Sequence, residues 1–441
     1  MSSSVVWDTV VRTDRAGWVE DRGQPVSRKR SALVIGVLVV VGALLGGVPA
    51  FGSSGGETDA RSGATTAKGP LPARTRAKVE QTVRRFKDAT HTPGVLVGLW
   101  SSKGTFVSAR GVADLKTGRR LTTAMQFKIA SQAKAFTGDL ILQLVGEGKV
   151  SLDDHISKWV AGVPNGDQIT IRQLLNMTSG LRTGFLADPA LQDWLVTGCT
   201  EADVLAAGAA QTPVAPPGTR WSYSNYGYDL LGRVVEVTTG QDISTAIQQR
   251  IARPLGLHRT LLPTTGNGLS APFTHGYGGV RPTKAPSVSD DATALRQSCT
   301  GASGGMVSTL SDLRRWSRAL GTGALLKPAV WTEANQGLVS FAFSDNYNGP
   351  GRWLQGLGFV KSGGFIGKEG SIPGYESITM YSPSRHTTIV VASTKQTNAI
   401  TPTRMFQALA MDVYGPNIGF GLTPAQALAP SYTGVEPEAE G

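Results

Sequence analysis

The chain has 441 residues, of which 40 % are apolar and 17 % are charged, against an average charged share of about 25 %. This composition is typical of a globular protein and excludes an intrinsically disordered chain. The net charge is +11, but the basic residues are scattered, so we expect solvated surface charge and no nucleic-acid partner. Neither CxxC nor HExxH spacing occurs, so no metal site and no cofactor are expected.

The N-terminus combines a polar segment with an uncharged apolar run. Residues 1–30 end in Arg28-Lys29-Arg30, and residues 31–51 then carry no charge. Because about 20 apolar residues span a bilayer, we predict a transmembrane anchor or a signal peptide over residues 31–52. The basic residues before the run predict that residues 1–30 are cytosolic and that the rest of the chain lies outside the cell membrane. Small residues at 48–50 would also permit cleavage, which would secrete the protein instead.

Two further segments flank the part of the chain that we expect to fold. Residues 53–70 are small and polar, which is typical of a flexible linker. Residues 429–441 end in alternating glutamates and are predicted to form a loose acidic tail. The remaining residues, 71–428, are predicted to form one folded body.

Helical periodicity and strand-like alternation both occur in this body. Apolar residues at helical spacing predict helices at residues 73–89, 131–147, 170–177, 201–209, 226–237, 242–253, 309–320 and 402–413. Short apolar runs bounded by turn residues predict strands at residues 95–100, 105–109, 357–360, 377–381 and 387–392. This order predicts an α+β fold, a mixed α/β sandwich. Its antiparallel sheet would be built from both ends of the body, with flanking helices and an inserted, mainly helical lobe.

The sharpest local motif is Ser131-x-x-Lys134, at the start of the helix predicted for residues 131–147. Three residues are nearly one helical turn, so the two side chains lie on the same side of the helix. A serine hydroxyl needs a nearby base to act as a nucleophile. The free N–H groups at a helix start can also stabilise a developing oxyanion. Taken alone, the pattern also fits a serine that only caps the helix.

Two more local patterns carry less meaning individually. Residues 223–225 (Tyr-Ser-Asn) lie in an aromatic turn before a helix, where a phenol and an amide can move a proton and orient a substrate. Residues 368–371 (Lys-Glu-Gly-Ser) combine a cation with a glycine, which permits close approach of a ligand backbone. Taken alone, the first also fits an aromatic turn packed in the core, and the second an exposed loop lysine.

Together, and in this order, the three motifs resemble those of the serine penicillin-recognising family. That family contains class C β-lactamases, D-alanyl-D-alanine carboxypeptidases and related esterases. The resemblance extends over about residues 75–415, and the agreement of several spaced motifs is far more specific than any one of them. Further similar segments are residues 111–118, 127–131, 147–154, 169–181 and 304–313.

The resemblance implies a role for each motif residue. Ser131 is implied to be the acylated nucleophile, Lys134 its activating partner and Tyr223 the proton carrier. The backbone N–H groups of Ser131 and Ser371 are implied to form the oxyanion hole. The residues implied to bind substrate are Asn225, which would orient the substrate amide, Lys368 as the cation, Gly370 and Ser371.

The protonation of the lysine matters for this chemistry. A lysine normally titrates near ~10.4. Burial and the like charge of Lys368 would lower the pKa of Lys134 and help it to act as a base. Lys134 and Tyr223 both stay open as the general base.

Two positions depart from the family pattern. The family often has histidine where this chain has Met177, a position that is usually structural. It commonly has a small or hydroxyl-bearing residue where this chain has Glu369. A carboxylate there would repel a substrate carboxylate unless it pairs with Lys368 or points away. Glu369 therefore weakens the expectation of a carboxypeptidase or β-lactamase and favours an esterase, amidase or aminopeptidase.

A second serine pattern competes with the first. Residues 301–305, around Ser303, match G-x-S-x-G, the nucleophile elbow of α/β-hydrolases, with Asp345 and His386 in a suitable chain order for a triad. That elbow follows a hydrophobic strand, whereas the preceding residues here are mostly polar. We therefore favour a glycine-rich turn for residues 301–305 and a turn position for His386.

Cys199 and Cys299 are predicted to form a disulfide. Two cysteines in an exported chain permit one bridge, and both lie in segments with the least family resemblance. Closing a loop of about 100 residues could stabilise the fold by as much as about 4.7 kcal/mol in the chain-entropy model.

The expected function is that of an exported serine hydrolase acting through an acyl-enzyme on Ser131, without metal or cofactor. The expected substrates are D-amino-acid peptides of the cell wall, as for a D,D-carboxypeptidase, or related amides and esters, with contact to peptidoglycan. An esterase, a D-aminopeptidase or a β-lactamase of the same fold is the alternative. A non-catalytic wall-binding module is the rival from a different class.

Overall fold

The computed structural model of this chain describes most of the predicted folded body. The described residues are 69–184, 194–278, 286–296, 298–341, 353–396, 401–421 and 423–428. The predicted N-terminal segment (1–30), anchor (31–52), most of the linker (53–68) and the acidic tail (429–441) lie outside these ranges, and they stay predictions. Within the described ranges, no helix combines the length and the apolar character needed to cross a membrane.

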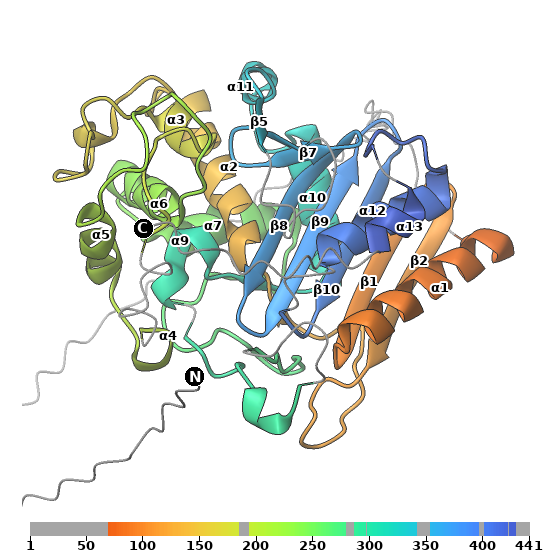
Figure 1. Cartoon of the computed structure of the whole chain (residues 1–441). Coiled ribbons are helices and arrows are strands. Elements are labelled where there is room, and N and C mark those ends of the chain that lie inside the picture. Colours follow the sequence, from red (N-terminus) through yellow and green to blue (C-terminus); the bar gives the residue numbers. More distant parts are fainter. Residues whose placement is uncertain are drawn as a thin grey trace, which may run out of the picture. The chain divides into compact units, whose positions relative to one another are not determined.

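An eight-stranded antiparallel sheet runs through the described body (Figure 1). Its order is β2-β1-β10-β9-β8-β7-β6-β5, so strands from the two ends of the body pair with each other where β1 meets β10. This confirms the predicted α+β architecture with one sheet built from both ends. The strands are β1 (Gly94–Ser101), β2 (Gly104–Gly111), β5 (Val339–Phe341), β6 (Trp353–Gln355), β7 (Val360–Ser362), β8 (Phe365–Ile372), β9 (Tyr375–Ser382) and β10 (Thr387–Ser393).

The strand that carries the third motif was not predicted from the sequence. Lys368 and Gly370 lie on β8, between β7 and β9 in the sheet order. The β8 sequence, Phe-Ile-Gly-Lys-Glu-Gly-Ser-Ile, has two glycines and two buried charged residues in its middle, and these residue types are depleted in strands. The strand predicted at residues 357–360 is wrong in its bounds, because most of that segment connects β6 to β7.

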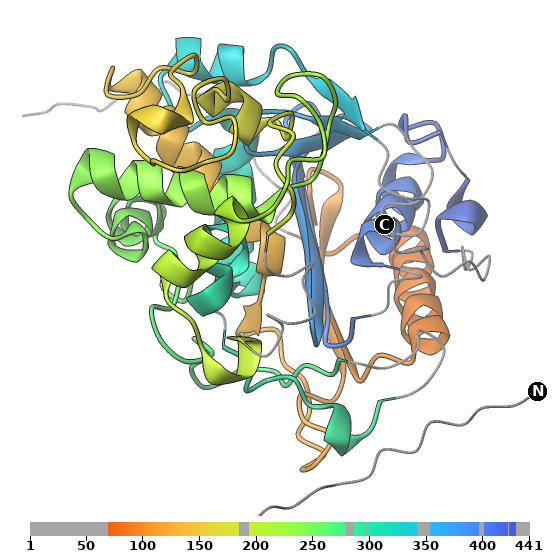
Figure 2. The ribbon, with the colours of Figure 1, turned by 60° about the vertical axis from the view of Figure 1, so that its left-hand side comes forward.

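Two helices from opposite ends of the body cover one face of the sheet (Figure 2). These are α1 (Ala73–Thr90) and α12 (Pro402–Tyr414), which pack against each other and confirm both predicted helices. Side chains alternate along a strand, so Val95 and Val97 of β1 join the core beneath these helices while Leu96 joins the core on the other face.

A mainly helical lobe covers the opposite face (Figure 2). Here α2 (Ala133–Gly146) and α10 (Leu310–Thr322) contact the sheet, and Phe136 stacks on Trp316 with ring centroids 3.9 Å apart. A short ribbon of β3 (Phe127–Lys128) and β4 (Val307–Ser308) accompanies them. The remaining described α-helices are α3 (Ile171–Leu175), α4 (Trp194–Thr197), α5 (Glu201–Ala209), α6 (Asn225–Thr239), α7 (Ile243–Ile247), α8 (Arg253–Leu255), α9 (Gly301–Gly304), α11 (Pro328–Ala334) and α13 (Pro424–Leu428).

Two predicted helices differ from the observed ones. The helix predicted at residues 170–177 ends at Leu175, and Met177 already has a positive φ of 63°. The helix predicted at residues 242–253 is divided into α7, a π-helical turn at Gln248–Ala252 and α8. Confirmed to within a few residues are the helices predicted at 131–147, 201–209, 226–237 and 309–320.

The predicted disulfide is present. Cys199 and Cys299 are bonded, with their Cα atoms 5.4 Å apart. They join the residue before the N-cap of α5 to the 3₁₀ turn before α9, beside a small apolar cluster that contains Leu195 and Val204. Because α9 packs on α2 and α6, the bond restrains a segment next to the first two motifs.

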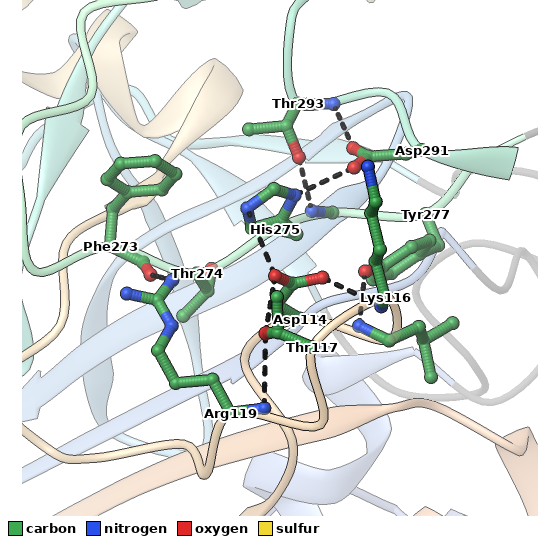
Figure 3. Close-up of polar contacts among 12 residues, drawn as sticks. Asp114, Lys116, Thr117, Arg119, Phe273, Thr274, His275, Tyr277, Asp291 and Thr293 are labelled. Atoms are coloured by element: carbon green, nitrogen blue, oxygen red, sulfur yellow. Dashed lines mark hydrogen bonds and ion pairs between the residues drawn. The ribbon is translucent and has the colours of Figure 1, made fainter. Parts of the chain in front are cut away.

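A polar cluster holds the loop after β2 against the segment that follows Ala271–Pro272 (Figure 3). His275 Nδ1 lies 2.7 Å from Asp291 Oδ2, and His275 Nε2 lies 4.0 Å from Asp114 Oδ2. The same segment supports the turn after β8, since the Tyr375 hydroxyl donates to the carbonyl of the neighbouring Thr274 at 2.8 Å. The cluster therefore helps to fix the hairpin that carries the third motif.

Candidate active site

Ser131 lies in the 3₁₀ turn Ala130–Gln132, which leads into α2. Ala130 has a positive φ of 49°, an uncommon and strained conformation for a residue with a side chain. The turn is tied to the sheet, because Gln132 Nε2 donates to Ser377 Oγ of β9 at 2.7 Å. The first motif therefore presents the serine on a fixed turn between α2 and the sheet.

Lys134 places its amine beside the Ser131 hydroxyl. The amine has three acceptors: Asn225 Oδ1 and the Ser303 carbonyl, each at 2.6 Å, and Ser131 Oγ at 3.2 Å. A charged lysine would use its three N–H donors on these atoms. A neutral amine has two N–H donors and one lone pair, so it can keep the two shorter contacts and direct the lone pair at Ser131. This geometry suits removal of the serine proton.

The surroundings of Lys134 favour the neutral amine. The side chain is fully buried, and burial lowers the pKa of Lys134 well below its ordinary value, assisted by the positive charge of Lys368. The carboxylates of Asp229 and Glu369 act in the opposite direction. The net direction agrees with the sequence-based expectation.

Tyr223 brings a second proton-bearing group to the same oxygen. Its hydroxyl donates to Ser131 Oγ at 2.7 Å, and the Lys134 amine lies 4.8 Å from the centroid of its ring. Burial raises the pKa of the Tyr223 phenol above its ordinary value, so the phenol is protonated at neutral pH. It can therefore donate a proton to a neighbouring atom but is poorly suited to accept one.

The start of α6 holds the second motif. The Ser224 hydroxyl caps the helix, and the Ser224 N–H donates to the sulfur of the buried Met177 at 3.4 Å. Asn225 Nδ2 donates to Thr183 Oγ1 at 2.9 Å, while its Oδ1 accepts from Lys134. The Asn225 amide, which was expected to orient a substrate, therefore also holds the Lys134 amine. Met177 supports the same motif through its contact with the Ser224 N–H.

The third motif approaches the serine turn from β8. A Cβ on Gly370 would clash with the Ile129 carbonyl and lie 2.9 Å from Ser131 N, so glycine lets these backbones come together. The hydroxyl of the next residue, Ser371, accepts from Gln396 Nε2 at 3.1 Å. The two residues expected to supply the oxyanion-hole N–H groups, Ser131 and Ser371, therefore lie on segments in direct contact.

Lys368 and Glu369 form a buried ion pair. Each residue is 3 % exposed, and Lys368 Nζ contacts Glu369 Oε1. Glu369 Oε2 has no hydrogen-bond partner among the residues that the structure describes. The Lys368 amine also lies 5.8 Å from the centroid of the Tyr223 ring, which keeps the pair beside the site. The alternative of an exposed loop lysine is therefore wrong, and the cation of the third motif is neutralised by its neighbour.

Two further residues, Ser303 and Asp229, contribute to the site and were not predicted from the sequence. Ser303 uses its backbone carbonyl to accept from Lys134, and its N–H donates to Asp229 Oδ1 at 3.2 Å. Backbone groups leave no pattern in a sequence. Asp229, however, follows Asn225 by about one helical turn, and this spacing predicts a shared helix face.

The competing nucleophile elbow is wrong. Ser303 lies in α9 after a 3₁₀ turn, not after a buried strand, and its hydroxyl donates to the Thr300 carbonyl at 2.9 Å. His386 lies in the turn between β9 and β10 with a φ of 47°, and Asp345 is outside the described residues. No group of three or more His, Cys, Asp or Glu side chains within the described ranges is arranged to hold a metal ion.

Comparison with known families agrees with this geometry. The family described as Beta-lactamase matches residues 79–410, which include all three motifs. The chain belongs to the β-lactamase family. It is a serine hydrolase of that family, as its resemblance to penicillin-recognising enzymes implied.

Individual members of the β-lactamase family and its structural neighbours extend the comparison. Penicillin-binding protein 4 of Amycolatopsis lactamdurans is 34 % identical over 203 residues, which are 44 % of this chain and 52 % of that protein, so the match spans about half of the relative. A D-stereospecific amidohydrolase from Streptomyces sp. is 28 % identical with a TM-score of 0.63, covering 74 % of this chain and 95 % of the other. The D-amino acid amidase from Ochrobactrum anthropi SV3, complexed with L-phenylalanine amide, is 26 % identical with a TM-score of 0.62, covering 73 % and 90 %.

Proposed function

We propose that this β-lactamase-family enzyme hydrolyses amides and esters of D-amino acids through an acyl-enzyme on Ser131, and that it disfavours substrates with a carboxylate beyond the scissile bond. The observation that carries the preference is the buried Lys368–Glu369 ion pair. A substrate carboxylate needs an uncompensated cation in the site. Here Glu369 neutralises Lys368 and would repel a second carboxylate. An amide or ester end group carries no charge and avoids this cost.

In the proposed acylation step, neutral Lys134 is the base. Its lone pair takes the proton of Ser131 while the serine oxygen forms a bond to the substrate carbonyl carbon. The N–H groups of Ser131 and Ser371 stabilise the oxyanion that develops. The proton then passes from Lys134 through the Tyr223 hydroxyl to the leaving nitrogen or oxygen, and the bond to the leaving group breaks.

Deacylation reverses the same proton path. A water molecule attacks the acyl carbonyl carbon and gives its proton to Lys134, directly or through the Tyr223 hydroxyl. The Ser131 oxygen then leaves the carbonyl carbon and recovers a proton from the same pair. Asn225 uses one N–H on Thr183 and its oxygen on Lys134, so its second N–H is the one that would orient the substrate amide.

Two further considerations support the D-amino-acid class. The names of the Streptomyces amidohydrolase and the Ochrobactrum amidase both specify D-stereochemistry. The predicted anchor at residues 31–52 would hold the catalytic domain outside the cell membrane, where peptidoglycan supplies peptides that contain D-amino acids. A D,D-carboxypeptidase activity would need to bind a terminal carboxylate, and Glu369 weighs against that activity.

A matched pair of substrates tests the preference. N-acetyl-D-alanyl-D-alanine and N-acetyl-D-alanine ethylamide share the scissile bond after the first D-alanine, and the ethylamide lacks only the terminal carboxylate. We expect kcat/KM to be at least about tenfold higher for the amide, a difference of about 1.4 kcal/mol. Equal values for the two substrates would contradict the preference. Ser131→Ala should remove turnover of both, and undiminished turnover in that variant would contradict the acyl-enzyme.

Variants connect the preference to the ion pair. Glu369→Gln keeps the shape of the side chain and removes its charge, so it should move the ratio of the two kcat/KM values toward the acid. Glu80→Gln is the matched control, because Glu80 forms an ion pair with Arg76 on α1, on the other face of the sheet. That control should leave the ratio unchanged.

A further inference from the structure

Asp229 reaches the site through the backbone of Ser303. The carboxylate is on α6, one helical turn after Asn225, and the residue is 6 % exposed. Its Oδ1 accepts the Ser303 N–H at 3.2 Å, and the Ser303 carbonyl accepts from Lys134 Nζ at 2.6 Å. Asn225 accepts from the same amine. α6 therefore holds Lys134 twice, directly through Asn225 and indirectly through Asp229.

We propose that Asp229 is a positioning residue that keeps the Ser303 carbonyl against the Lys134 amine and, through its negative charge, limits how readily that amine becomes neutral. The inference rests on the proposed acyl-enzyme function of Ser131. It assigns two separable contributions to one side chain. The hydrogen bond from the Ser303 N–H to Asp229 positions the Ser303 carbonyl, and the negative charge of Asp229 favours the charged form of Lys134.

Of the two carboxylates that act on Lys134, Glu369 forms an ion pair with Lys368, whereas Asp229 forms no ion pair among the residues that the structure describes. Lys368 and Glu369 act on the Lys134 amine in opposite directions, and Lys368 has the larger effect. The titratable groups that act on the Lys134 amine are Tyr223, Tyr228 and Asp229 from the α6 segment and Lys368 and Glu369 from β8. On the side away from Lys134, the negative charge of Glu201 on α5 acts to raise the pKa of Asp229. The negative charge of Asp229 in turn acts to raise the pKa of Tyr226.

The direction of the effect follows from the signs of these charges. Burial raises the pKa of Asp229, while the hydrogen bond with Ser303 and the positive charge of Lys134 act to lower it and so favour the ionised carboxylate. Ionised Asp229 favours the charged form of Lys134. Removing the carboxylate charge would lower the pKa of Lys134 further, so the neutral amine would persist to lower pH.

The test measures the reactivity of Ser131 without assuming a natural substrate. The full chain is treated with a fluorophosphonate probe across a pH series, and labelling is followed by intact mass. In that reaction the bond from Ser131 Oγ to phosphorus forms, the phosphorus–fluorine bond breaks, fluoride leaves and the serine proton passes to Lys134. The labelling rate therefore falls at low pH as Lys134 becomes protonated.

Two variants separate position from charge. Asp229→Asn keeps an acceptor for the Ser303 N–H, so its maximal labelling rate should stay near that of the wild type while the acidic limb moves to lower pH by about one unit. Asp229→Leu loses the acceptor as well, so its rate should fall by about 100-fold at every pH. The side chain borders a cavity of about 310 Å³, which gives a substituted residue room to be accommodated.

The control is Asp139→Asn, a substitution of the same kind on α2. Asp139 is buried and accepts from Gln143 Nε2 at 2.8 Å, with no bond to Ser303. Its variant should keep the wild-type pH profile.

Each outcome decides the inference. An acidic limb that stays in place in Asp229→Asn overturns it, and so does wild-type labelling of Asp229→Leu. If Asp229→Leu does not fold by circular dichroism, the Asp229→Asn profile decides alone. A wild-type chain that is not labelled on Ser131 at any pH would overturn the proposed function itself, and the inference with it, so the two failures are distinguishable.

Discussion

At Gly370 the need for glycine comes from the neighbouring backbone, since the φ of this residue is not in the left-handed region. The serine turn approaches β8 so closely that no Cβ fits between Gly370 and Ile129 or Ser131. This contact sets the distance between the nucleophile and the strand that carries Ser371. Because Gly370 has no side chain, the two proposed oxyanion-hole donors, the N–H groups of Ser131 and Ser371, can come close together.

Gly370→Ala should lower kcat by about 100-fold, because the added methyl group displaces the serine turn from β8 and small displacements in an active site are costly. Steady-state kinetics on an ester substrate, combined with the melting temperature, would measure this. Gly69→Ala is the matched control, since nothing lies within 4 Å of a Cβ built there. A normal kcat for Gly370→Ala would show that the two backbones separate without loss of function.

At the scale of elements, α6 organises more of the site than any single motif does. Its N-cap contacts Met177, its first residue Asn225 holds Lys134, and its next turn provides Asp229. α9 packs against both α6 and α2, and it follows the cysteine that is bonded to the start of α5. The disulfide thus closes a loop that contains α6 and restrains the segment whose carbonyl accepts from the lysine.

Removal of the disulfide should lower the free energy of unfolding. The chain-entropy model for a loop of about 100 residues gives a loss of as much as about 4.7 kcal/mol, and measured losses are often smaller. Chemical denaturation of the wild type with and without reductant would measure the change. The double variant Cys199→Ala and Cys299→Ala should match the reduced wild type and should not respond to reductant. Identical midpoints in all samples would contradict the prediction.

At the scale of the whole molecule, the two ends of the folded body depend on each other. β1 and β10 pair within the sheet, beside its edge strand β2, and α1 packs on α12, although the members of each pair are separated by almost the whole domain in the sequence. The active site lies between this sheet and the inserted lobe. The domain predicted at residues 71–428 should therefore tolerate loss of the flanking segments better than any cut within it.

The apolar run at residues 31–52 should determine where the enzyme is found. With an intact anchor, the full chain should sediment with membranes, resist extraction by high salt and be digested when protease is added to intact cells. Deletion of residues 31–52 should leave the enzyme in the cytosol, whereas deletion of residues 431–441 should not change its location. Full-length protein found in the soluble cytosolic fraction would contradict the prediction, and a shortened protein in the medium would indicate cleavage.

The sequence by itself determined the features that depend on neighbours along the chain. Helical spacing revealed α1, α2, α5 and α12 because burial of one helix face imposes a short-range period. The pairing of Ser131 with Lys134 was evident because one helical turn separates them. The three motifs in order were likewise enough to predict the family, and two cysteines in a chain that is predicted to be exported were enough to predict the disulfide.

Only the tertiary structure decided the features that depend on contacts between distant segments. β8 is buried because β7 and β9 pair with it on both sides. Its own sequence contains two charged residues and is not typical of a buried strand, so the strand was not predicted. Whether Glu369 would pair with Lys368 or point away was open until both side chains were seen to be buried together. The Ser303 N–H donates to Asp229, and the Ser303 carbonyl accepts from Lys134. Every residue possesses these two backbone groups, so packing and not residue type brings them to the site.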